Sequence, residues 1–148
     1  MKRHIIIDLD GTLCNSAHRE ELARNREWEA FHDLLIHDQP HDDVVEFMRA
    51  ADDLNKMIAL TGRPEKYRNL TLEWLNKNEL NLFEQLIMRP DDDWRSDHVL
   101  KPEMLFTYFG SKEKALESVL VILEDRDRLV EEWRNLGFRC WQVQPGGY

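Results

Sequence analysis

The chain has few cysteines and no long hydrophobic run. Cys14 and Cys140 fit no metal-ligand or redox spacing, and a disulfide framework needs more of them, so we expect two free thiols in a reducing, cytoplasmic setting. No apolar run approaches the roughly 18 residues that a membrane span requires. The apolar triplet at residues 5–7 is too short for the core of a signal peptide. We therefore expect a cytoplasmic protein with no membrane partner.

Basic residues are outnumbered by acidic ones. The 148 residues include 20 Lys and Arg against 29 Asp and Glu, giving a net charge of −9. This balance disfavours non-specific binding to nucleic acid or a membrane surface, which needs a basic field. It leaves open the recognition of a nucleic-acid end by a few local arginines. The length suits a single domain over residues 1–148 with a real core, and no Pro/Gly/Ser linker divides it.

Short apolar runs alternate with helical patterns along the chain. Residues 4–9 and 119–123 are continuous apolar runs, typical of strands buried on both faces. Weaker apolar runs at residues 56–60 and 86–88 predict two more strands of this type, and the alternating pattern of residues 138–143 predicts an edge strand. Apolar residues at helical spacing predict helices between the strands, at residues 44–51, 67–74 and 129–136. The order predicts an α/β fold with an open parallel sheet covered by helices on both faces. In such folds the site lies at the carboxyl ends of the strands.

The first strand ends in the sequence Asp8-Leu9-Asp10-Gly11-Thr12. Carboxylates at i and i+2 of a strand share one face and repel each other. A chain tolerates this when a cation or a proton lies between them. Gly11 allows a sharp turn after the second carboxylate.

Three further polar groups follow predicted strands or begin helices. Thr61-Gly62-Arg63 offers a hydroxyl, a flexible glycine and a guanidinium that could hold an oxyanion. Pro102 would begin a helix, which places Lys101 just before a helix N-terminus as a fixed cation. Glu124-Asp125-Arg126-Asp127 directly follows the fourth strand, where the alternative is an acidic cluster that complements a helix dipole.

In this order the four groups resemble the motifs of the haloacid dehalogenase superfamily of phosphatases. More narrowly, the chain resembles the 3′-phosphatase domains of bacteriophage polynucleotide kinase-phosphatases, most specifically over residues 130–143, and at Arg19, eleven residues after Asp8. The resemblance implies a Rossmannoid three-layer fold with a central parallel sheet and a short helical cap insert at residues 14–55. Two features depart from the family: Glu124 replaces an aspartate, and no G-x-x-x-x-G-K-S/T kinase motif occurs.

The resemblance assigns chemistry to these positions. Asp8 attacks phosphorus, and Asp10, which we expect to be neutral at the start because of the charge of Asp8, protonates the leaving oxygen. A hard oxygen site suits Mg²⁺, with Asp8, the Asp10 main-chain carbonyl and Asp125 as ligands and Glu124 as support. By the same resemblance, Thr61 and Lys101 bind the phosphoryl oxygens, and Asp97 orients Lys101 or Arg63. Substrate beyond the scissile phosphate is bound by Arg19, Gly62 and Arg63.

The substrate stays open between nucleic-acid 3′ ends and free nucleotides or another small phosphate ester. A non-catalytic protein of this fold would have lost Asp8 or Asp10, and both are present. A homo-oligomer in which two copies share a substrate stays open, as does a separately encoded kinase or ligase partner.

The insert and one later loop carry further candidates. A short insert predicts an open site that can admit a chain end. We expect the apolar residues of the insert to pack onto the core; these are Trp28, Phe31, Leu34 and Leu35. We expect its histidines and aspartates to form a solvated loop rather than a second metal site; these are His32, His37, Asp38, His41 and Asp42. Trp94 could stack on a base, although its acidic neighbours disfavour a phosphate chain there.

Overall fold

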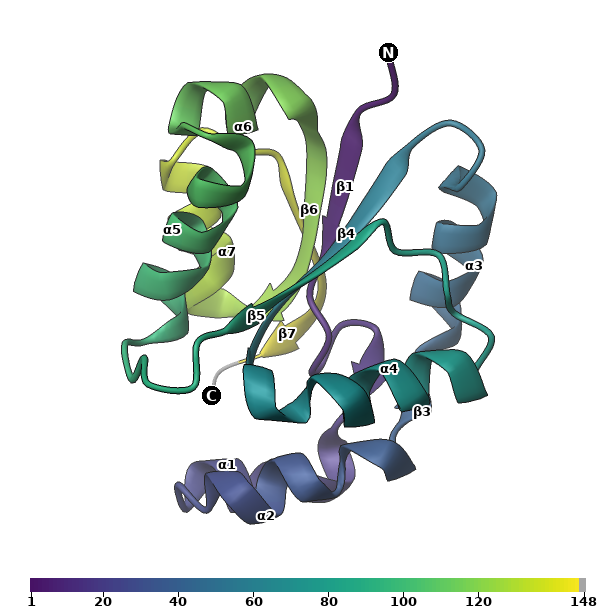
Figure 1. Cartoon of the computed structure of the whole chain (residues 1–148), viewed down its shortest axis with the longest axis vertical. Helices are drawn as coiled ribbons and strands as arrows, with labels where there is room; N and C mark the ends of the chain where they lie inside the picture. Colours follow the sequence, from purple (N-terminus) through teal and green to yellow (C-terminus); the bar gives the residue numbers. More distant parts are fainter. Residues whose placement is uncertain (147–148) are drawn as a thin grey trace.

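The computed structural model describes residues 1–146, and its centre is a five-stranded sheet in which every neighbouring pair of strands is parallel. The strand order is β5-β4-β1-β6-β7 (Figure 1). The bounds are His4–Ile7 for β1, Lys56–Pro64 for β4, Gln85–Arg89 for β5, Val119–Arg126 for β6 and Cys140–Gly146 for β7. The predicted parallel sheet is confirmed. β4 runs to Pro64, beyond the expected end at residue 60, and the predicted edge strand lies at Cys140–Gly146.

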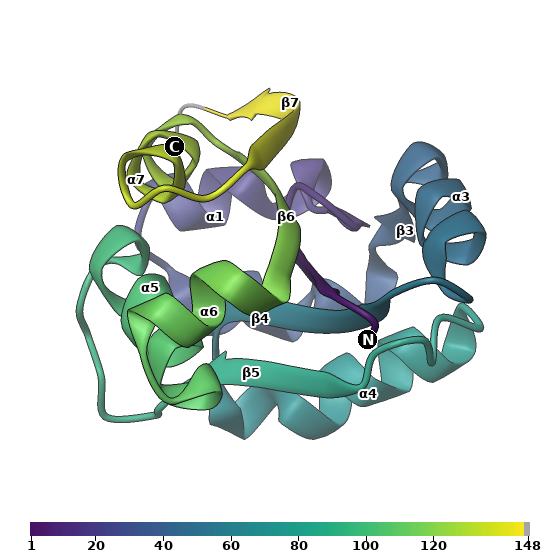
Figure 2. The same cartoon turned by 90° about the horizontal axis from the view of Figure 1, so that it is seen from above.

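Alternating side chains of the strands supply two cores. In β1, Ile5 and Ile7 face one core while Ile6 faces the other, and all three are essentially inaccessible. The period of two along a strand separates them in this way. Figures 1 and 2 show α3 and α4 on one side of the sheet and α5, α6 and α7 on the other, which makes three layers. The core helices span Asp42–Ala51 (α3), Arg68–Lys77 (α4), Asp97–Phe109 (α5), Lys112–Ser118 (α6) and Asp127–Asn135 (α7).

The start of α5 differs from the prediction. This helix begins at Asp97, so Pro102 lies inside it and Lys101 lies within its second turn rather than before its N-terminus. Proline removes one backbone donor from a helix. Burial of Leu100 and Leu105, at 1% and 0% exposure, outweighs that loss and carries the helix through Pro102.

The insert predicted over residues 14–55 divides into two parts. Its last helix, α3, covers the sheet, while the earlier elements lie beyond the carboxyl ends of the strands (Figure 1). Those elements are β2 (Cys14–Asn15), η1 (Ala17–Arg19), α1 (Glu20–Arg24), α2 (Trp28–Asp33), η2 (Leu35–His37) and β3 (Gln39–Pro40), with β2 and β3 paired antiparallel. Phe31 and Leu35 are buried as expected, but Trp28 and Leu34 are 48% and 37% exposed, so the expectation that all four pack inward is wrong.

Cys14 and Cys140 are both free, as expected, and both are buried. Within residues 1–146, none of the helices has the length and apolar character that crossing a bilayer requires.

Candidate active site

Three carboxylates meet where the neighbouring strands β1 and β6 end. Oxygen atoms of Asp8, Glu124 and Asp125 lie within 4.8 Å of one another, and all three side chains are buried. The ammonium of Lys101 donates to Oδ1 of Asp8 at 2.6 Å and to Oε2 of Glu124 at 3.1 Å. The Thr12 hydroxyl lies 3.2 Å from Oδ2 of Asp8 and 3.2 Å from Oδ1 of Asp125. Sequence motifs far apart in the chain therefore form one cluster.

Gly11 makes the close approach of the two strand ends possible. Its φ is 86°, in the left-handed region that glycine adopts readily. A Cβ atom at this position would lie 2.1 Å from Oδ2 of Asp125. Any larger residue here would push the Asp125 carboxylate away from Asp8.

The cluster is short of positive charge. Burial and the charge of Asp8 raise the pKa of Asp125 to about 8 and raise the pKa of Glu124 well above its usual value. Burial alone would lower the pKa of Lys101, but Asp8 and Glu124 outweigh it and raise that pKa. With one ammonium among three carboxylates, a divalent cation would balance the remaining negative charge, and buried oxygen donors of this kind fit Mg²⁺.

The two acidic residues of β6, Glu124 and Asp125, differ in the hydrogen bonds that their carboxylate oxygens accept. Both oxygens of Glu124 have protein partners, because Oε2 accepts from Lys101 and Oε1 accepts from the backbone N–H of Asp125 at 3.1 Å. Asp125 has its Thr12 contact, and its oxygens approach Asp8. This difference favours Asp125 as the direct metal ligand and Glu124 as its support.

Asp10 lies beside this cluster in a different electrostatic setting. Its Oδ1 accepts from Nη2 of Arg63 at 2.6 Å and from Nη2 of Arg19 at 2.5 Å. Burial would raise the pKa of Asp10, but the two guanidinium groups outweigh it and hold that pKa well below its usual range. The expectation of a neutral Asp10 before substrate binds is therefore wrong, because the charges of Arg19 and Arg63 act on this carboxyl group more strongly than that of Asp8.

Arg19 and Arg63 do not reach outward. Each is 1% exposed, and both side chains form ion pairs with carboxylates of the protein. The prediction that they contact substrate beyond the scissile phosphate is therefore wrong. Both guanidinium groups lie behind Asp10, and its carboxylate is one of the charged partners that a buried guanidinium needs.

Asp97 also has other partners than expected. It pairs with Arg89 and with Nη1 of Arg126, the latter at 2.6 Å, rather than with Lys101 or Arg63. Gly62 lies against it, since a Cβ atom there would be 2.5 Å from Oδ1 of Asp97. Asp97 thus holds the cavity wall together and influences Lys101 only through its charge.

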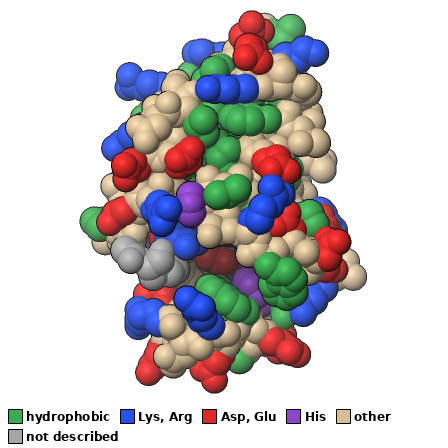
Figure 3. Space-filling view, turned by 90° about the vertical axis from the view of Figure 1, so that its left-hand side faces the viewer, with side chains coloured by type: hydrophobic (Ala, Val, Ile, Leu, Met, Phe, Trp, Pro, Cys, Tyr) green, Lys and Arg blue, Asp and Glu red, His purple; other side chains and the backbone are tan. Residues whose placement is uncertain are grey.

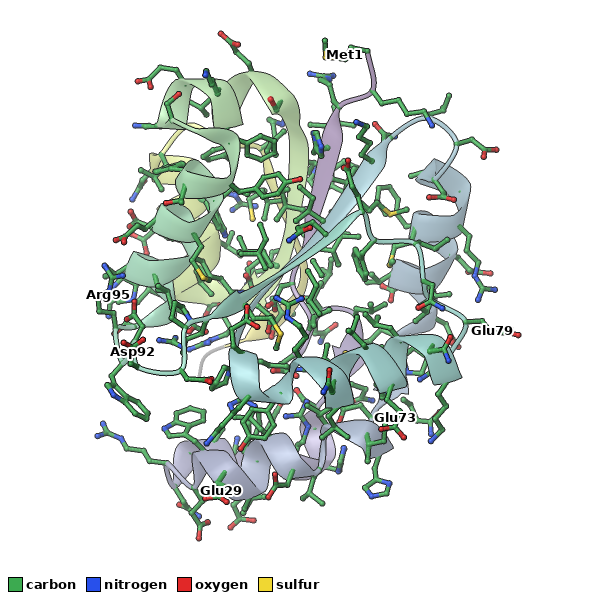
Figure 4. The ribbon with its side chains drawn as sticks, in the orientation of Figure 1. Met1, Glu29, Glu73, Glu79, Asp92 and Arg95 are labelled. Carbon is green, nitrogen blue, oxygen red and sulfur yellow. The ribbon has the colours of Figure 1, made fainter. Side chains whose placement is uncertain are left out.

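A cavity of about 860 Å³ opens above these groups. Asp8, Asp10 and Thr61 are among the residues that line its floor, and Gly62 and Asp97 are among its wall residues. Figure 3 shows the hollow between the insert and the rest of the molecule, with acidic side chains in its depth and basic, histidine and apolar side chains around it. In Figure 4, Asp92 and Arg95 lie on the loop between β5 and α5, and Glu29 points outward from α2; that loop and the insert border the cavity.

Sequence reasoning missed several residues of this region. The mouth of the cavity includes exposed Arg24, Arg26 and Arg128, which follow no motif and which only the fold brings together. The expected solvated loop is also partly wrong, because His32 and Asp38 are 7% and 3% exposed. Polar residues in an irregular insert give no sequence signal of burial.

Similar arrangements occur in known proteins. The Streptococcus pneumoniae protein SP0104, a haloacid dehalogenase-like hydrolase, superimposes with a TM-score of 0.66 at 12% identity, over 95% of this chain and 84% of that one, which shows the shared fold. With an aspartate-bearing strand end, a lysine and an acidic pair in one cluster, the chain is a phosphatase of the haloacid dehalogenase superfamily. Residues 2–148 match the family described as "Polynucleotide kinase PNKP phosphatase domain", and the chain belongs to that family.

Two relatives are longer proteins. A protein of Autographa californica nuclear polyhedrosis virus named "Putative bifunctional polynucleotide kinase/RNA ligase" is 26% identical over 136 residues, which cover 90% of this chain and 18% of the viral protein. A chain in the Pnkp1/Rnl/Hen1 RNA repair complex superimposes with a TM-score of 0.81 at 28% identity, over 99% of this chain and 44% of that one. The chain therefore spans less than half the length of either relative.

Proposed function

We propose that the protein is a Mg²⁺-dependent phosphomonoesterase that removes 3′-phosphates from nucleic-acid ends. The observation that carries this proposal is the open cavity over Asp8 and Asp10, whose mouth holds arginines and exposed tryptophans in an otherwise acidic protein. Membership of the polynucleotide kinase phosphatase family supports the same substrate class.

The reaction proceeds in two displacements. A carboxylate oxygen of Asp8 attacks phosphorus, the bond from phosphorus to the 3′ oxygen breaks, and the leaving oxygen takes a proton from Asp10. Water then attacks the aspartyl-phosphate, its proton passes to Asp10, and Asp8 is released with inorganic phosphate. Two moderate barriers replace the direct hydrolysis of a phosphate monoester, which is extremely slow.

Asp10 must take up a proton before it can act as the general acid. In the structure Asp10 is ionised beside Arg19 and Arg63. A phosphate group placed over Asp8 brings negative charge next to Asp10, which favours protonation of that carboxyl group. Binding of the phosphate and readiness of the general acid are therefore coupled.

The cluster at the strand ends holds the phosphoryl group and the metal. Asp8 and Asp125 would ligate Mg²⁺ together with the main-chain carbonyl of Asp10, and Glu124 would support Asp125. The bound ion supplies positive charge that lowers the repulsion between the anionic nucleophile and the anionic phosphate. Lys101 and the Thr61 hydroxyl would bind the phosphoryl oxygens, since Lys101 contacts Asp8 and Thr61 lines the cavity with Asp8.

The cavity mouth fits a polynucleotide end. Six arginines and four carboxylates line the cavity, whereas the whole chain has a net charge of −9. Trp94 and Trp28 line the same cavity at 84% and 48% exposure, so their rings are available to unpaired bases. Arginines that contact phosphates and aromatic rings that stack on bases are the usual elements of single-strand binding.

A kinase or a ligase is the partner that the relatives suggest. The viral relative is named for both activities, and the structural relative is part of an RNA repair complex. We propose that this chain acts with such an enzyme, which would use the 3′ hydroxyl that the phosphatase leaves.

The competing proposal is a phosphatase of free nucleotides, which the net charge of −9 favours. A substrate panel separates the two: an oligonucleotide with a 3′-phosphate, the same oligonucleotide with a 5′-phosphate, and free 3′- and 5′-mononucleotides. We expect hydrolysis of the 3′-phosphorylated end and sparing of the 5′-phosphorylated end. Faster hydrolysis of free 5′-mononucleotides than of any oligonucleotide end would replace our proposal with the nucleotidase.

A further inference from the structure

Asp38 is a buried carboxylate that none of the four motifs contains. It lies in the insert between η2 and β3, and its side chain is completely inaccessible. Its Oδ1 accepts from Nε of Arg19 at 2.9 Å and contacts Nε2 of His18 at 2.6 Å, and its Oδ2 accepts from Nη2 of Arg19 at 2.6 Å. Removing a carboxylate from water is costly unless its oxygens gain such partners, so this position has a specific role.

Asp38 completes a ring of four alternating charges. Nη2 of Arg19 also donates to Oδ1 of Asp10 at 2.5 Å. Nη2 of Arg63 donates to the same oxygen at 2.6 Å and lies 3.8 Å from Oδ2 of Asp38. Two guanidinium groups and two carboxylates therefore balance, and Asp10 is the member of the ring that lines the cavity.

The ring is fixed to the core from several directions. Trp74 of α4 donates its indole N–H to the Asp38 carbonyl at 2.8 Å, and Nη1 of Arg63 donates to the Thr71 hydroxyl at 3.1 Å. Nη1 of Arg19 donates to the Phe31 carbonyl at 3.2 Å. Asp38 thus joins the insert to α4 and holds Arg19 at the same time.

The two oxygens of Asp10 are held unequally by this ring. Oδ1 accepts from both Nη2 groups, whereas Oδ2 accepts at the longer distance of 3.2 Å from Nε of Arg63. Oδ2 therefore has the greater capacity to carry and deliver a proton. The direction in which Oδ2 points depends on where the guanidinium groups hold Oδ1.

We propose that Asp38 is a positioning residue, which orients the carboxyl group of Asp10 toward the leaving oxygen by fixing Arg19. This inference rests on the proposed role of Asp10 as general acid. Without the Asp38 charge, Arg19 loses its charged acceptor at Nε and one of its two acceptors at Nη2, and it turns toward Asp10, the remaining carboxylate of the ring that it already contacts. Asp10 then turns from its productive direction, and a small misplacement of a catalytic group is enough to slow the reaction strongly.

The test compares two leaving groups under single-turnover conditions with enzyme in excess. Release of dephosphorylated oligonucleotide from a 3′-phosphorylated end requires a proton on an alkoxide, whereas p-nitrophenolate leaves p-nitrophenyl phosphate without one. General acid-base catalysis contributes roughly 10²–10⁴-fold, so we expect Asp38→Asn to slow the oligonucleotide reaction about tenfold to hundredfold. Release of p-nitrophenolate should fall by no more than about twofold, because it needs no general acid.

Two further variants keep the test decisive. Asp33→Asn makes the same change at an exposed position of the same insert and should alter neither reaction. Because Asp38→Asn leaves a buried guanidinium short of an acceptor, it can unfold the chain, and Asp38→Asn combined with Arg19→Gln removes that charge as well. If Asp38 acts through Arg19, the double variant should be no slower on the oligonucleotide than Arg19→Gln alone.

Equal losses on the two substrates, or no loss on either, would overturn the inference. Multiplying losses in the double variant would also overturn it, since they would show that Asp38 acts independently of Arg19. If the wild-type protein fails to act on oligonucleotide 3′ ends, the proposed substrate is wrong, and the same comparison uses the free nucleotide that it does hydrolyse, whose leaving group is also an alkoxide.

Discussion

The ammonium of Lys101 lies 2.6 Å from Oδ1 of Asp8, in contact with the carboxylate that we propose as the nucleophile. This ion pair is buried on both sides, with side-chain exposures of 2% and 7%. A lysine at this distance stabilises the nucleophile as an anion and can move to the phosphoryl oxygens once the nucleophile has reacted. The pair therefore connects the first motif of the sequence to the third.

Asp8→Asn should abolish turnover without unfolding the chain. An amide has the shape of the carboxylate, and its oxygen can still accept from Lys101 while its NH₂ group lies beside the Thr12 hydroxyl, but it cannot form the aspartyl-phosphate. The measurements are phosphate release and the thermal midpoint by circular dichroism. Retention of a tenth of wild-type activity would exclude the covalent mechanism.

Asp125→Asn should raise the Mg²⁺ concentration needed for half-maximal activity far more than Glu124→Gln does. Both oxygens of Glu124 already have protein partners, whereas the Asp125 carboxylate faces Asp8 and needs a cation. Mg²⁺ titrations of activity after EDTA treatment give the comparison, with loss and recovery of wild-type activity as the control. The reverse order would assign direct ligation to Glu124.

His32 should make the folded protein sensitive to acid. Burial and the charges of Arg63 and Arg19 lower the pKa of His32 to about 4, below its ordinary value near 6.5. The unfolded chain therefore binds the proton first as the pH falls through 6.5, and stability decreases from there toward pH 4. The total effect on the free energy of unfolding is about 3 kcal/mol, at 1.36 kcal/mol for each pKa unit.

Urea unfolding of wild type and His32→Asn between neutral pH and about pH 4.5 isolates this effect, because every other titrating group is shared. The wild type should lose more stability than the variant across this range, by on the order of 2 kcal/mol. Parallel stability curves for the two proteins would show that His32 is not buried in its neutral form.

Trp94→Ala should raise KM for a 3′-phosphorylated oligonucleotide and leave hydrolysis of p-nitrophenyl phosphate little changed. Loss of one base–aromatic stack costs roughly 1–3 kcal/mol, or about fivefold to 150-fold in binding. Trp141→Ala is the matched control, since Trp141 is 48% exposed but packs on Phe47 away from the cavity. An unchanged KM in Trp94→Ala would remove the stacking role from this residue.

The sequence by itself determined the sheet and the floor of the site. Continuous apolar runs such as residues 119–123 can be buried on both faces only in a central strand, so their pattern predicts the parallel sheet. Asp8 and Glu124-Asp125 follow such runs directly, and parallel strands bring their carboxyl ends to one edge. Local pattern and sheet geometry together were enough to predict this cluster.

Only the tertiary structure decided the partners of the remaining charges. Asp97 is four residues from Lys101 in sequence, yet it pairs with Arg89 and Arg126 because β5 and β6 bring those side chains to the start of α5. Asp38 looks like a loop residue in the sequence, and it is buried because Arg19 and Arg63 meet it where the insert touches α4. Long charged side chains choose among all the partners that packing brings within reach, and sequence spacing carries no record of that choice.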